Sequence, residues 1–326
     1  MTEDPSRPNS EPDLSVVVVN YNTANLLERM FAALDRAKGP LQLQIIVVDN
    51  ASTDNSVEIL EGQYPAVTLI KNSKNVGFGR ANNQAMTHLK GRYTLLLNTD
   101  AFLAPDTLEK TIAFMEGHPR CGVLGVKLVN EDGILQPSCR YFPTPWNVFL
   151  QKTGLSRLFP SHRLVDDLSW DHAAIRQCDW VPGCFYLVRG KAIEQLGLFD
   201  PRFFLYYEEI DHCRVVKTAG WDVIYYPDTE VVHIGGESAK STSTITEVGR
   251  QISPLQIESE LLYFRKYFGL SGVIAGVALS TSADLLSAFN GLLRRLDLRG
   301  MSRAVRHIST VMRIFGATGF AAHPTR

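Results

Sequence analysis

The chain has 326 residues, 45% of them hydrophobic and 21% charged, an ordinary composition for a globular protein that can bury a sizeable core as one large or two small domains. Its five cysteines form no CxxC pair, and their odd number argues against a disulfide framework. The formal net charge of −1 hides a basic tail, since residues 285–326 carry seven arginines and one acid. Only that tail is suited to meet anions, and no nucleic-acid partner is expected.

The first part of the chain alternates apolar strands with amphipathic helices. Residues 1–13 are rich in Pro, Ser and acids and lack an apolar signal core, so we expect a disordered lead and a cytoplasmic protein. Residues 14–19 form an apolar run with four valines, which is typical of a strand buried on both faces. Residues 24–37 repeat apolar side chains at helical spacing. Further strands are expected over 44–48, 67–70 and 93–97, and further helices over 55–61, 79–89 and 105–116.

This alternation predicts the α/β class, with a mostly parallel, doubly wound sheet. In such sheets ligands bind beyond the carboxyl ends of the strands. The polar side chains expected at those ends are Asn20, Asn22, Asp49, Asn98 and Asp100.

The second half has a different pattern. The sequence Asn-Glu-Asp-Gly at 130–133 predicts a hairpin turn between strands over 122–127 and 133–136. Polar loop sequence follows over 151–177. We then expect a strand over 178–188 that is broken by Pro182-Gly183, a helix from Glu208 to Gly220, and short strands over 222–226 and 229–233.

The usual glycine-rich phosphate cradles are missing, because the sequence contains neither GxGxxG nor GxxxxGK[ST]. A divalent cation would then be needed to hold a diphosphate, and magnesium is usually bound by one or two carboxylates plus substrate phosphates. Asp100, at the end of an apolar strand, suits that role. The alternative for both Asp100 and Asp49 is an ordinary loop or capping acid.

Four segments, in this order and spacing, resemble glycosyltransferase family 2: VVVVNYN at 16–22, VVDNASTD at 47–54, NVGFGRANN at 75–83 and LLLNTD at 95–100. WVPG at 180–183, GLFD at 197–200, FFLYYEEID at 203–211 and VH at 232–233 are similar to its rhamnosyltransferase-like branch. The resemblance implies a GT-A fold. We expect a nucleotide-sugar-binding half over 14–125, an acceptor-binding and catalytic half over 126–245, and a C-terminal helical region over 246–326.

The resemblance also implies a set of roles at the donor site, with Mg²⁺ or Mn²⁺ as the metal. Asp49 matches the acid that contacts the nucleobase or ribose, and Asp100 the last acid of the DXD metal motif. Asn98 replaces the first acid of that motif and brings no charge. His233 matches a histidine that completes the metal site in some relatives, with a satisfied strand-end histidine as the alternative. The further candidates for binding the nucleotide sugar are Asn20, Asn22, Arg80, Trp180 and Gly183.

Inverting transfer needs a base that takes the proton of the acceptor hydroxyl. The base of the family maps to Glu209, where a glutamate replaces an aspartate and changes the reach by one methylene, so Glu208 and Asp211 remain candidates. The alternative is that these acids merely charge a helix N-terminus. Arg140 lies in a pattern also seen in the rhamnosyltransferase-like branch and is a candidate ligand for an acceptor phosphate or a donor sugar; a strand-edge charge is its alternative.

Residues 270–289 are apolar and long enough to span a bilayer, but Asp284 and five Ser or Thr residues argue against a true span. Arginines follow at 294, 295, 299, 303 and 306. We therefore expect peripheral contact of residues 270–313 with the inner face of the cell membrane, and a soluble helical cap is the alternative.

Together these features predict an inverting glycosyltransferase. The expected donor is a dTDP- or UDP-linked sugar, for which the resemblance suggests L-rhamnose, and the expected acceptor is a hydroxyl of a cell-surface polysaccharide or lipid-linked saccharide. A nucleotidyltransferase, and a non-catalytic nucleotide-sugar-binding protein of the same fold, remain as alternatives.

Overall fold

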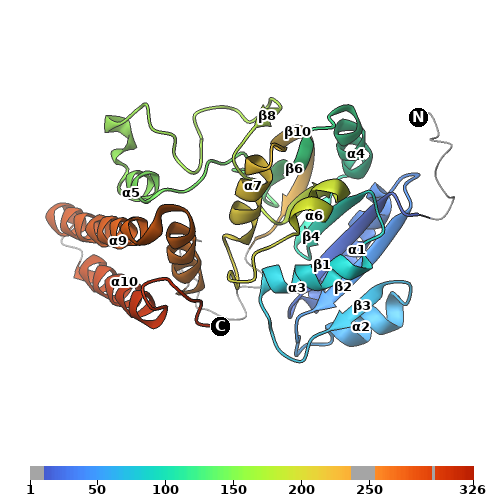
Figure 1. Cartoon of the computed structure of the whole chain (residues 1–326), viewed down its shortest axis with the longest axis horizontal. Helices are drawn as coiled ribbons and strands as arrows, with labels where there is room; N and C mark the ends of the chain where they lie inside the picture. Colours follow the sequence, from blue (N-terminus) through green and yellow to red (C-terminus); the bar gives the residue numbers. More distant parts are fainter. Residues whose placement is uncertain (1–10, 236–253, 296–297) are drawn as a thin grey trace.

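A ten-stranded mixed sheet runs through the part of the chain that the computed structural model describes, which is residues 11–235, 254–295 and 298–326 (Figure 1). Its first half is parallel. Strands β3 (Thr68–Lys71), β2 (Leu43–Asp49), β1 (Leu14–Asn20) and β4 (Tyr93–Asn98) lie side by side in that order. Their carboxyl ends therefore meet at one edge, where the polar residues Asn20, Asp49 and Asn98 lie.

The second half of the sheet is mixed. Strand β9 (Phe185–Arg189) inserts antiparallel between β4 and β6 (Cys121–Val129), and β10 (Asp222–His233) lies parallel to β6. Strand β5 (Ala101–Leu103) pairs antiparallel with the end of β10. The short strands β7 (Leu135–Gln136) and β8 (Arg176–Gln177) pair with β6 and β10. The α/β class is confirmed, and the insertion of β9 makes the sheet mixed beyond β4.

Both faces of the sheet are buried, as the valine run predicts. Val16 and Val18 face one apolar core, and Val17 and Val19 face the other. The first core is covered by α1 (Ala24–Ala37), α2 (Ser56–Gln63) and α4 (Thr107–Gly117). The second is covered by α3 (Phe78–Gln84), α6 (Gly190–Leu196) and α7 (Glu208–Thr218). Each buried aliphatic side chain contributes about 1.5–3 kcal/mol, so the three-layer arrangement is strongly favoured.

Several element boundaries differ from the sequence-based expectation. The expected helix over 79–89 ends as α3 at Gln84 and continues as a 3₁₀ turn, η1 (Ala85–His88). The strands expected over 222–226 and 229–233 are one strand, β10, because Pro227 lies at a shift of register against β6 rather than in a turn. The loop expected over 151–177 contains the end of α5 (Pro145–Thr153) and the 3₁₀ turn η2 (Leu155–Leu158), and the strand expected from 178 begins only at Phe185.

A layer of helices lies beside the sheet, at the left of Figure 1, and consists of α5, α9 (Pro254–Arg295) and α10 (Leu298–Ala317). Gly269, with φ of 66°, breaks α9 into two helical halves. The first half buries Tyr263 and Phe264 in the core that contains α7, and the second half packs Ala283 against α5. We call α5, α9 and α10 the helical layer. The expected boundary between residues 245 and 246 and most of the expected disordered lead, residues 1–10, lie outside the described residues.

Candidate active site

The loops after β1 and β2 are joined by side-chain hydrogen bonds. Asn20 and Asp49 are register partners, and Asn20 Nδ2 donates to Asp49 Oδ1 at 2.8 Å and to Ser52 Oγ at 3.0 Å. The backbone N–H of Ser52 donates to Asp49 Oδ2 at 3.0 Å, and Asn22 Oδ1 accepts from the Thr53 backbone at 2.7 Å. Asn20 and Asn22 thus organise the two loops, and Asn20 fixes the orientation of the buried Asp49 carboxylate.

A second connection joins the start of α3 to the segment before α7. Gly77 has φ of 90°, and a Cβ there would lie 2.3 Å from the carbonyl oxygen of Phe204, so only glycine fits. The Phe78 N–H donates to the same carbonyl at 2.8 Å. Asn50 holds this loop from β2, because its amide donates to Asn75 Oδ1 at 2.9 Å. The motifs at 47–54, 75–83 and 203–211 therefore meet in space.

The candidate metal ligands Asp100 and His233 are brought together at the carboxyl end of β10. His233 Nε2 lies 3.6 Å from Asp100 Oδ1, and Asp100 Oδ2 accepts from the Gly235 N–H at 3.1 Å. Gln136 holds the imidazole, since its Oε1 lies 2.9 Å from His233 Nδ1 and its Nε2 donates to the His233 carbonyl at 2.8 Å. Gln136 thereby turns Nε2 towards Asp100, as the outer partners of metal-binding histidines do.

The surroundings of His233 raise the pKa of its imidazole. Burial disfavours its charged form, but Cys184 and the Asp100 carboxylate favour it, and the pKa of His233 rises to about 9. A metal ion binds only the neutral imidazole, so metal binding here would release a proton.

Asp100 and His233 suit a cation whose other ligands come from a bound substrate and water. Mg²⁺–ligand bonds of about 2.1 Å let one ion join atoms up to about 4.2 Å apart, and the observed 3.6 Å lies within that limit. Within the described ranges, no three His, Cys, Asp or Glu side chains cluster as a closed metal site. The remaining ligands would have to come from a diphosphate and from water. Asn98, the last residue of β4, is half-buried.

The two candidate bases open α7 and are both held in apolar surroundings. Burial, reinforced by the neighbouring Glu209 carboxylate, raises the pKa of Glu208 well above its usual range, and burial also raises the pKa of Glu209. One oxygen of each, Oε2, is buried without a hydrogen-bond partner among the described residues. Glu208 is packed against Gly79, whereas Glu209 lies beside Gly183 and is less deeply buried. Buried carboxylates with one oxygen free of partners and a raised pKa are typical of proton-transfer sites.

The third candidate, Asp211, is already bonded on both oxygens. Lys266 Nζ lies 2.6 Å from its Oδ1, and the Tyr267 hydroxyl donates to the same oxygen at 2.7 Å. Lys266 also donates to Asp211 Oδ2 at 2.8 Å. Asp211 therefore links α7 to the first half of α9. No sequence signal for this link was available, because Lys266 and Tyr267 lie 55 and 56 residues further along the chain.

The charge of Arg140 reaches both the candidate base Glu209 and the candidate metal ligand His233. Its guanidinium stacks 4.8 Å from the ring of the buried Trp180, its Nε contacts Asp166 Oδ1 at 3.0 Å, and its charge lowers the pKa values of both Glu209 and His233. Arg140 is thus a shared neighbour of the candidate base and the candidate metal site. The guanidinium of Arg80 instead donates to the backbone carbonyls of Pro201 and Arg326.

Comparison with known proteins agrees with this geometry. The model of the family described as Glycosyl transferase family 2 matches residues 15–167. The N-acetylglucosaminyl-diphospho-decaprenol L-rhamnosyltransferase of Mycobacterium tuberculosis is 29% identical over 245 residues, which cover 68% of this chain and 75% of that protein. Residues 15–167 therefore form a domain of glycosyl transferase family 2. The chain is a glycosyltransferase with a rhamnosyltransferase-like relative.

More distant proteins match the transferase as well. A low-salt glycan biosynthesis hexosyltransferase, Agl10 of Haloferax volcanii, is 22% identical over 205 residues, which cover 62% of this chain and 60% of that protein. A mannosyltransferase of Pyrobaculum calidifontis, solved in complex with GDP-Man and Mn²⁺, superimposes with a TM-score of 0.56 at 17% identity and covers 97% of this chain and 89% of that chain. The structural likeness shows that the transferase has the GT-A fold.

Proposed function

We propose that the transferase moves a sugar, with inversion, from a nucleoside diphosphate to a hydroxyl group of a lipid-linked or polysaccharide acceptor. The observation that carries this proposal is the meeting of Asp100 and His233 at the end of β10, 3.6 Å apart, where they could hold a cation. Glu209, at the start of α7, has one buried oxygen without a hydrogen-bond partner among the described residues. A cation site for the departing diphosphate and a carboxylate able to take a proton are what a single displacement at an anomeric carbon requires.

In the proposed reaction Glu209 takes the proton of the acceptor hydroxyl. The acceptor oxygen forms its bond to the anomeric carbon, and the bond from that carbon to the diphosphate breaks on the opposite face. Glu209 is preferred over Asp211, whose oxygens are bonded to Lys266 and Tyr267, and over Glu208, which is packed beneath Gly79. A base positioned in this way typically contributes 10²–10⁴-fold in rate, by order of magnitude.

The donor would be held by residues at the ends of the parallel strands. Asp49 would accept hydrogen bonds from the base or ribose, and Asp100 and His233 would bind Mg²⁺ or Mn²⁺, which when bound neutralises the departing diphosphate. Asn98, Trp180 and Gly183 remain candidates for contact with the sugar nucleotide. Asn20 and Asn22 act through the loops that they organise. Arg80, whose guanidinium donates to the carbonyls of Pro201 and Arg326, is not assigned to the donor phosphates.

The donor is proposed by likeness to the mycobacterial rhamnosyltransferase. The mycobacterial relative is named for L-rhamnose and for a decaprenol diphosphate acceptor, and we propose dTDP-L-rhamnose and a polyprenyl diphosphate saccharide by likeness. A UDP-sugar is the second candidate, because the Asp49 carboxylate can pair with the imide of either thymine or uracil.

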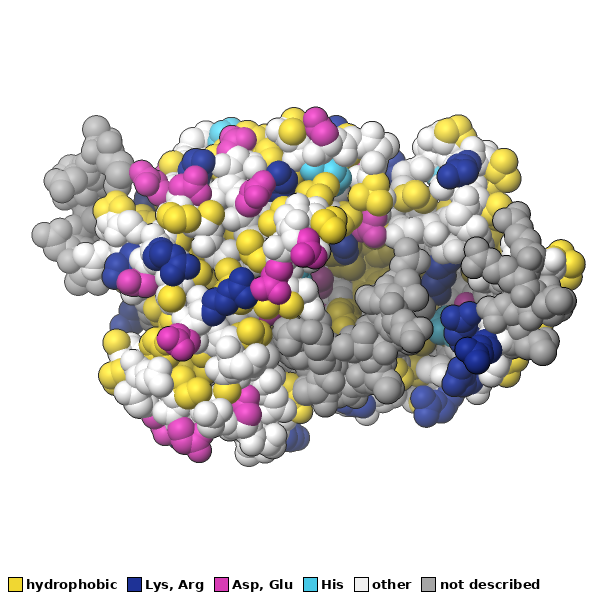
Figure 2. All heavy atoms as spheres, turned by 180° about the vertical axis from the view of Figure 1, so that it is seen from behind, with side chains coloured by type: hydrophobic (Ala, Val, Ile, Leu, Met, Phe, Trp, Pro, Cys, Tyr) yellow, Lys and Arg dark blue, Asp and Glu magenta, His cyan; other side chains and the backbone are white. Residues whose placement is uncertain are grey.

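The helical layer suits a lipid-linked acceptor. Its exposed surface carries Leu285, Leu286 and Phe289 on α9 and Met301, Val305 and Met312 on α10. Figure 2 shows Lys and Arg side chains gathered at the same end of the molecule. By length and composition Pro254–Gly291 could cross a membrane, a property shared with core helices of soluble proteins, and 33% of its most apolar window is buried. We propose peripheral binding to an anionic cytoplasmic leaflet.

The test is a turnover assay with dTDP-L-rhamnose, UDP-sugars and GDP-mannose, each with Mg²⁺, Mn²⁺ or chelator. Release of the nucleoside diphosphate and transfer of the sugar to a polyprenyl diphosphate saccharide are measured, and NMR of the product gives the anomeric configuration. We expect metal-dependent transfer with inversion from one of these donors. Nucleotide-sugar binding without any turnover would instead favour a non-catalytic protein of the same fold.

A further inference from the structure

The segment that leads into α7 has an unusual backbone. Tyr206 and Tyr207 both have positive φ values, 68° and 70°. Bulky side chains rarely adopt this left-handed region, and two in succession need support from their surroundings. The two residues directly precede Glu208 and Glu209, so their conformation sets the direction in which α7 presents the glutamates.

The first half of α9 supplies that support at two points. The Tyr207 hydroxyl donates to Glu260 Oε2 at 2.9 Å, and Ser259 Oγ donates to the Leu205 carbonyl at 2.9 Å. The Tyr207 ring is buried and lies 5.3 Å, between centroids, from the ring of Tyr263. The hydroxyl of Tyr207 is therefore anchored in a buried setting, where a lost partner is poorly replaced by water.

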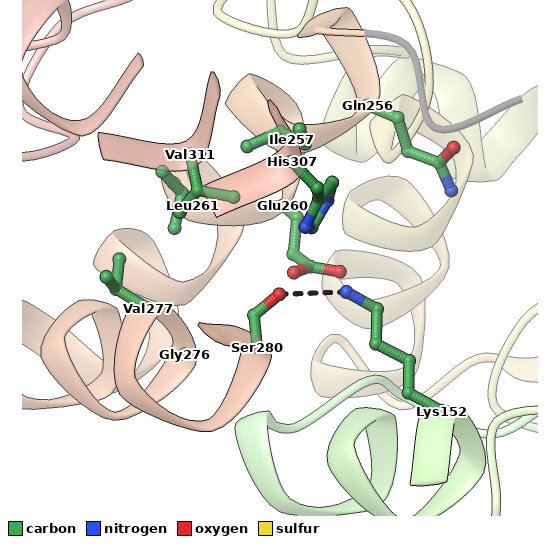
Figure 3. Close-up of a pocket in the computed structure, with 10 residues that line it drawn as sticks. All are labelled: Lys152, Gln256, Ile257, Glu260, Leu261, Gly276, Val277, Ser280, His307 and Val311. Carbon is green, nitrogen blue, oxygen red and sulfur yellow. Dashed lines mark hydrogen bonds between the residues drawn. The ribbon is translucent and has the colours of Figure 1, made fainter. Parts of the chain in front are cut away.

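Glu260 also belongs to the wall of a cavity of about 50 Å³ inside the helical layer. In Figure 3 its carboxylate points towards Lys152 of α5 and Ser280 of α9, and Lys152 Nζ donates to Ser280 Oγ at 2.8 Å. Glu260, like Ser259, is thus a residue of the helical layer that hydrogen-bonds to the segment before the glutamates. Ser280 shares the cavity, and no hydrogen bond joins it to Tyr207 within the described residues.

We propose that Glu260 is a positioning residue for the transferase, which holds Tyr207 in its left-handed conformation and so sets the direction of Glu209. Glu260 acts through Tyr207 and does not itself touch the reacting atoms. The inference rests on the proposed role of Glu209 as the base. It assigns to the helical layer a part in catalysis that is separate from membrane contact.

The kinetic test uses Glu260→Ala, Glu260→Gln, Tyr207→Phe and the double variant Tyr207→Phe/Glu260→Ala, with Ser280→Ala as the matched control. We expect kcat to fall about tenfold in Glu260→Ala and in Tyr207→Phe, with the donor KM within about twofold, because positioning acts on the chemical step. Glu260→Gln keeps an acceptor oxygen and should restore most of kcat.

The double variant should lose no more activity than either single variant, since both substitutions remove the same hydrogen bond. Ser280→Ala should match the wild type.

A second measurement, hydrogen exchange of the backbone amides over 204–210, does not depend on turnover. Exchange should be faster in Glu260→Ala and Tyr207→Phe and unchanged in Ser280→Ala. Wild-type kcat and wild-type exchange in Glu260→Ala would overturn the inference, as would equal losses in Glu260→Gln and Glu260→Ala. If Glu260→Ala does not fold, Tyr207→Phe and Glu260→Gln decide the matter. Absence of turnover in the wild type would contradict the proposed function alone, since exchange still reports on positioning.

Discussion

At the scale of single residues, burial and hydrogen bonding separate side chains of the same chemical class. Glu209 has a raised pKa and an oxygen without a partner among the described residues, whereas the oxygens of Asp211 are occupied by Lys266 and Tyr267. The first arrangement leaves a carboxylate able to take a proton, and the second fixes a helix in place. The difference arises from what packs around each acid, not from its position in the helix.

Glu209→Gln should therefore lower kcat by about 10²–10⁴-fold and leave donor affinity nearly unchanged, because the amide keeps the shape but cannot accept a proton. Single-turnover kinetics and calorimetric donor binding give the two quantities. Glu208→Gln is the matched control and should lose less activity. Full activity of Glu209→Gln would move the role of base to Glu208 or Asp211.

The pH dependence of kcat should report the same carboxylate. Only ionised Glu209 can take a proton, so kcat should fall as the pH drops through a pKa above the ordinary value of 4.5. Arg140 lowers this pKa, so Arg140→Ala should move the acid limb of the profile to higher pH, and Arg140→Lys, which keeps the charge, should move it less. A limb that stays in place in Arg140→Ala would contradict this electrostatic link.

Asp100→Ala should abolish metal-dependent donor binding, because the carboxylate supplies the only full negative charge assigned to the proposed cation site within the described part of the chain. Binding of Mn²⁺ with a nucleoside diphosphate, followed by electron paramagnetic resonance, measures this without turnover. His233→Ala should weaken the same binding by a smaller factor. Unchanged Mn²⁺ binding in Asp100→Ala would place the cation elsewhere.

At the scale of elements, the contact between the start of α3 and the segment before α7 joins the loop proposed to lie beside the nucleotide to the helix that carries the proposed base. Its tightest point is Gly77, whose backbone approaches the Phe204 carbonyl more closely than any Cβ would allow. The Phe78 N–H donates to that carbonyl, so the approach also satisfies a helix-terminal donor. The glycine is thus required by a close approach and by a positive φ together.

Gly77→Ala should lower the free energy of unfolding by about 1–3 kcal/mol or more. The alanine would be strained at φ of 90°, and its Cβ would also clash with Phe204. Urea unfolding measures the loss. Gly133→Ala is the matched control, because Gly133 has φ of 75° but its added Cβ would meet no described atom within 4 Å. Equal losses in the two variants would show that the contact with Phe204 adds nothing.

At the scale of the whole molecule, the helical layer combines two surfaces. Its inner surface packs on α7 through the first half of α9, and its outer surface exposes apolar side chains beyond the break at Gly269. Exposed Arg306 and Arg313 of α10 lie in the same layer. A protein that acts on a lipid-linked saccharide gains from holding its active site close to the leaflet that carries this acceptor.

The substitution of Arg306 and Arg313 by Glu should weaken binding to anionic vesicles by about tenfold or more, because each basic residue near such a surface contributes about 1 kcal/mol. Cosedimentation with phosphatidylglycerol vesicles at low and high salt measures the effect. The control is the double variant Lys90→Glu/Lys191→Glu, which makes the same change in net charge at two exposed sites outside the layer. It should bind the vesicles as the wild type does. Equal loss in both double variants would assign binding to net charge alone.

The α/β class and the order of the first elements could be read from the sequence alone. Strands buried on both faces leave continuous apolar runs, amphipathic helices leave a period of 3.6 residues, and these patterns follow the chain from β1 to α4. The sequence also identified the family, because the motifs at 16–22, 47–54, 75–83 and 95–100 are contiguous. Asp49 and Asp100 followed as candidates from those motifs, and Glu209 followed from the motif at 203–211.

The arrangement of these candidates depends on contacts between distant parts of the chain. The pairing of β5 with β10 brings Asp100 to His233, which lies 133 positions further along the chain. Side chains of α9, more than 50 positions away, hydrogen-bond to the Asp211 carboxylate and to the Tyr207 hydroxyl. The left-handed conformation of Tyr206 and Tyr207 is imposed against local preference by such contacts. Interactions between distant parts of the chain leave no periodic trace in one sequence, so they become visible only when the chain is folded.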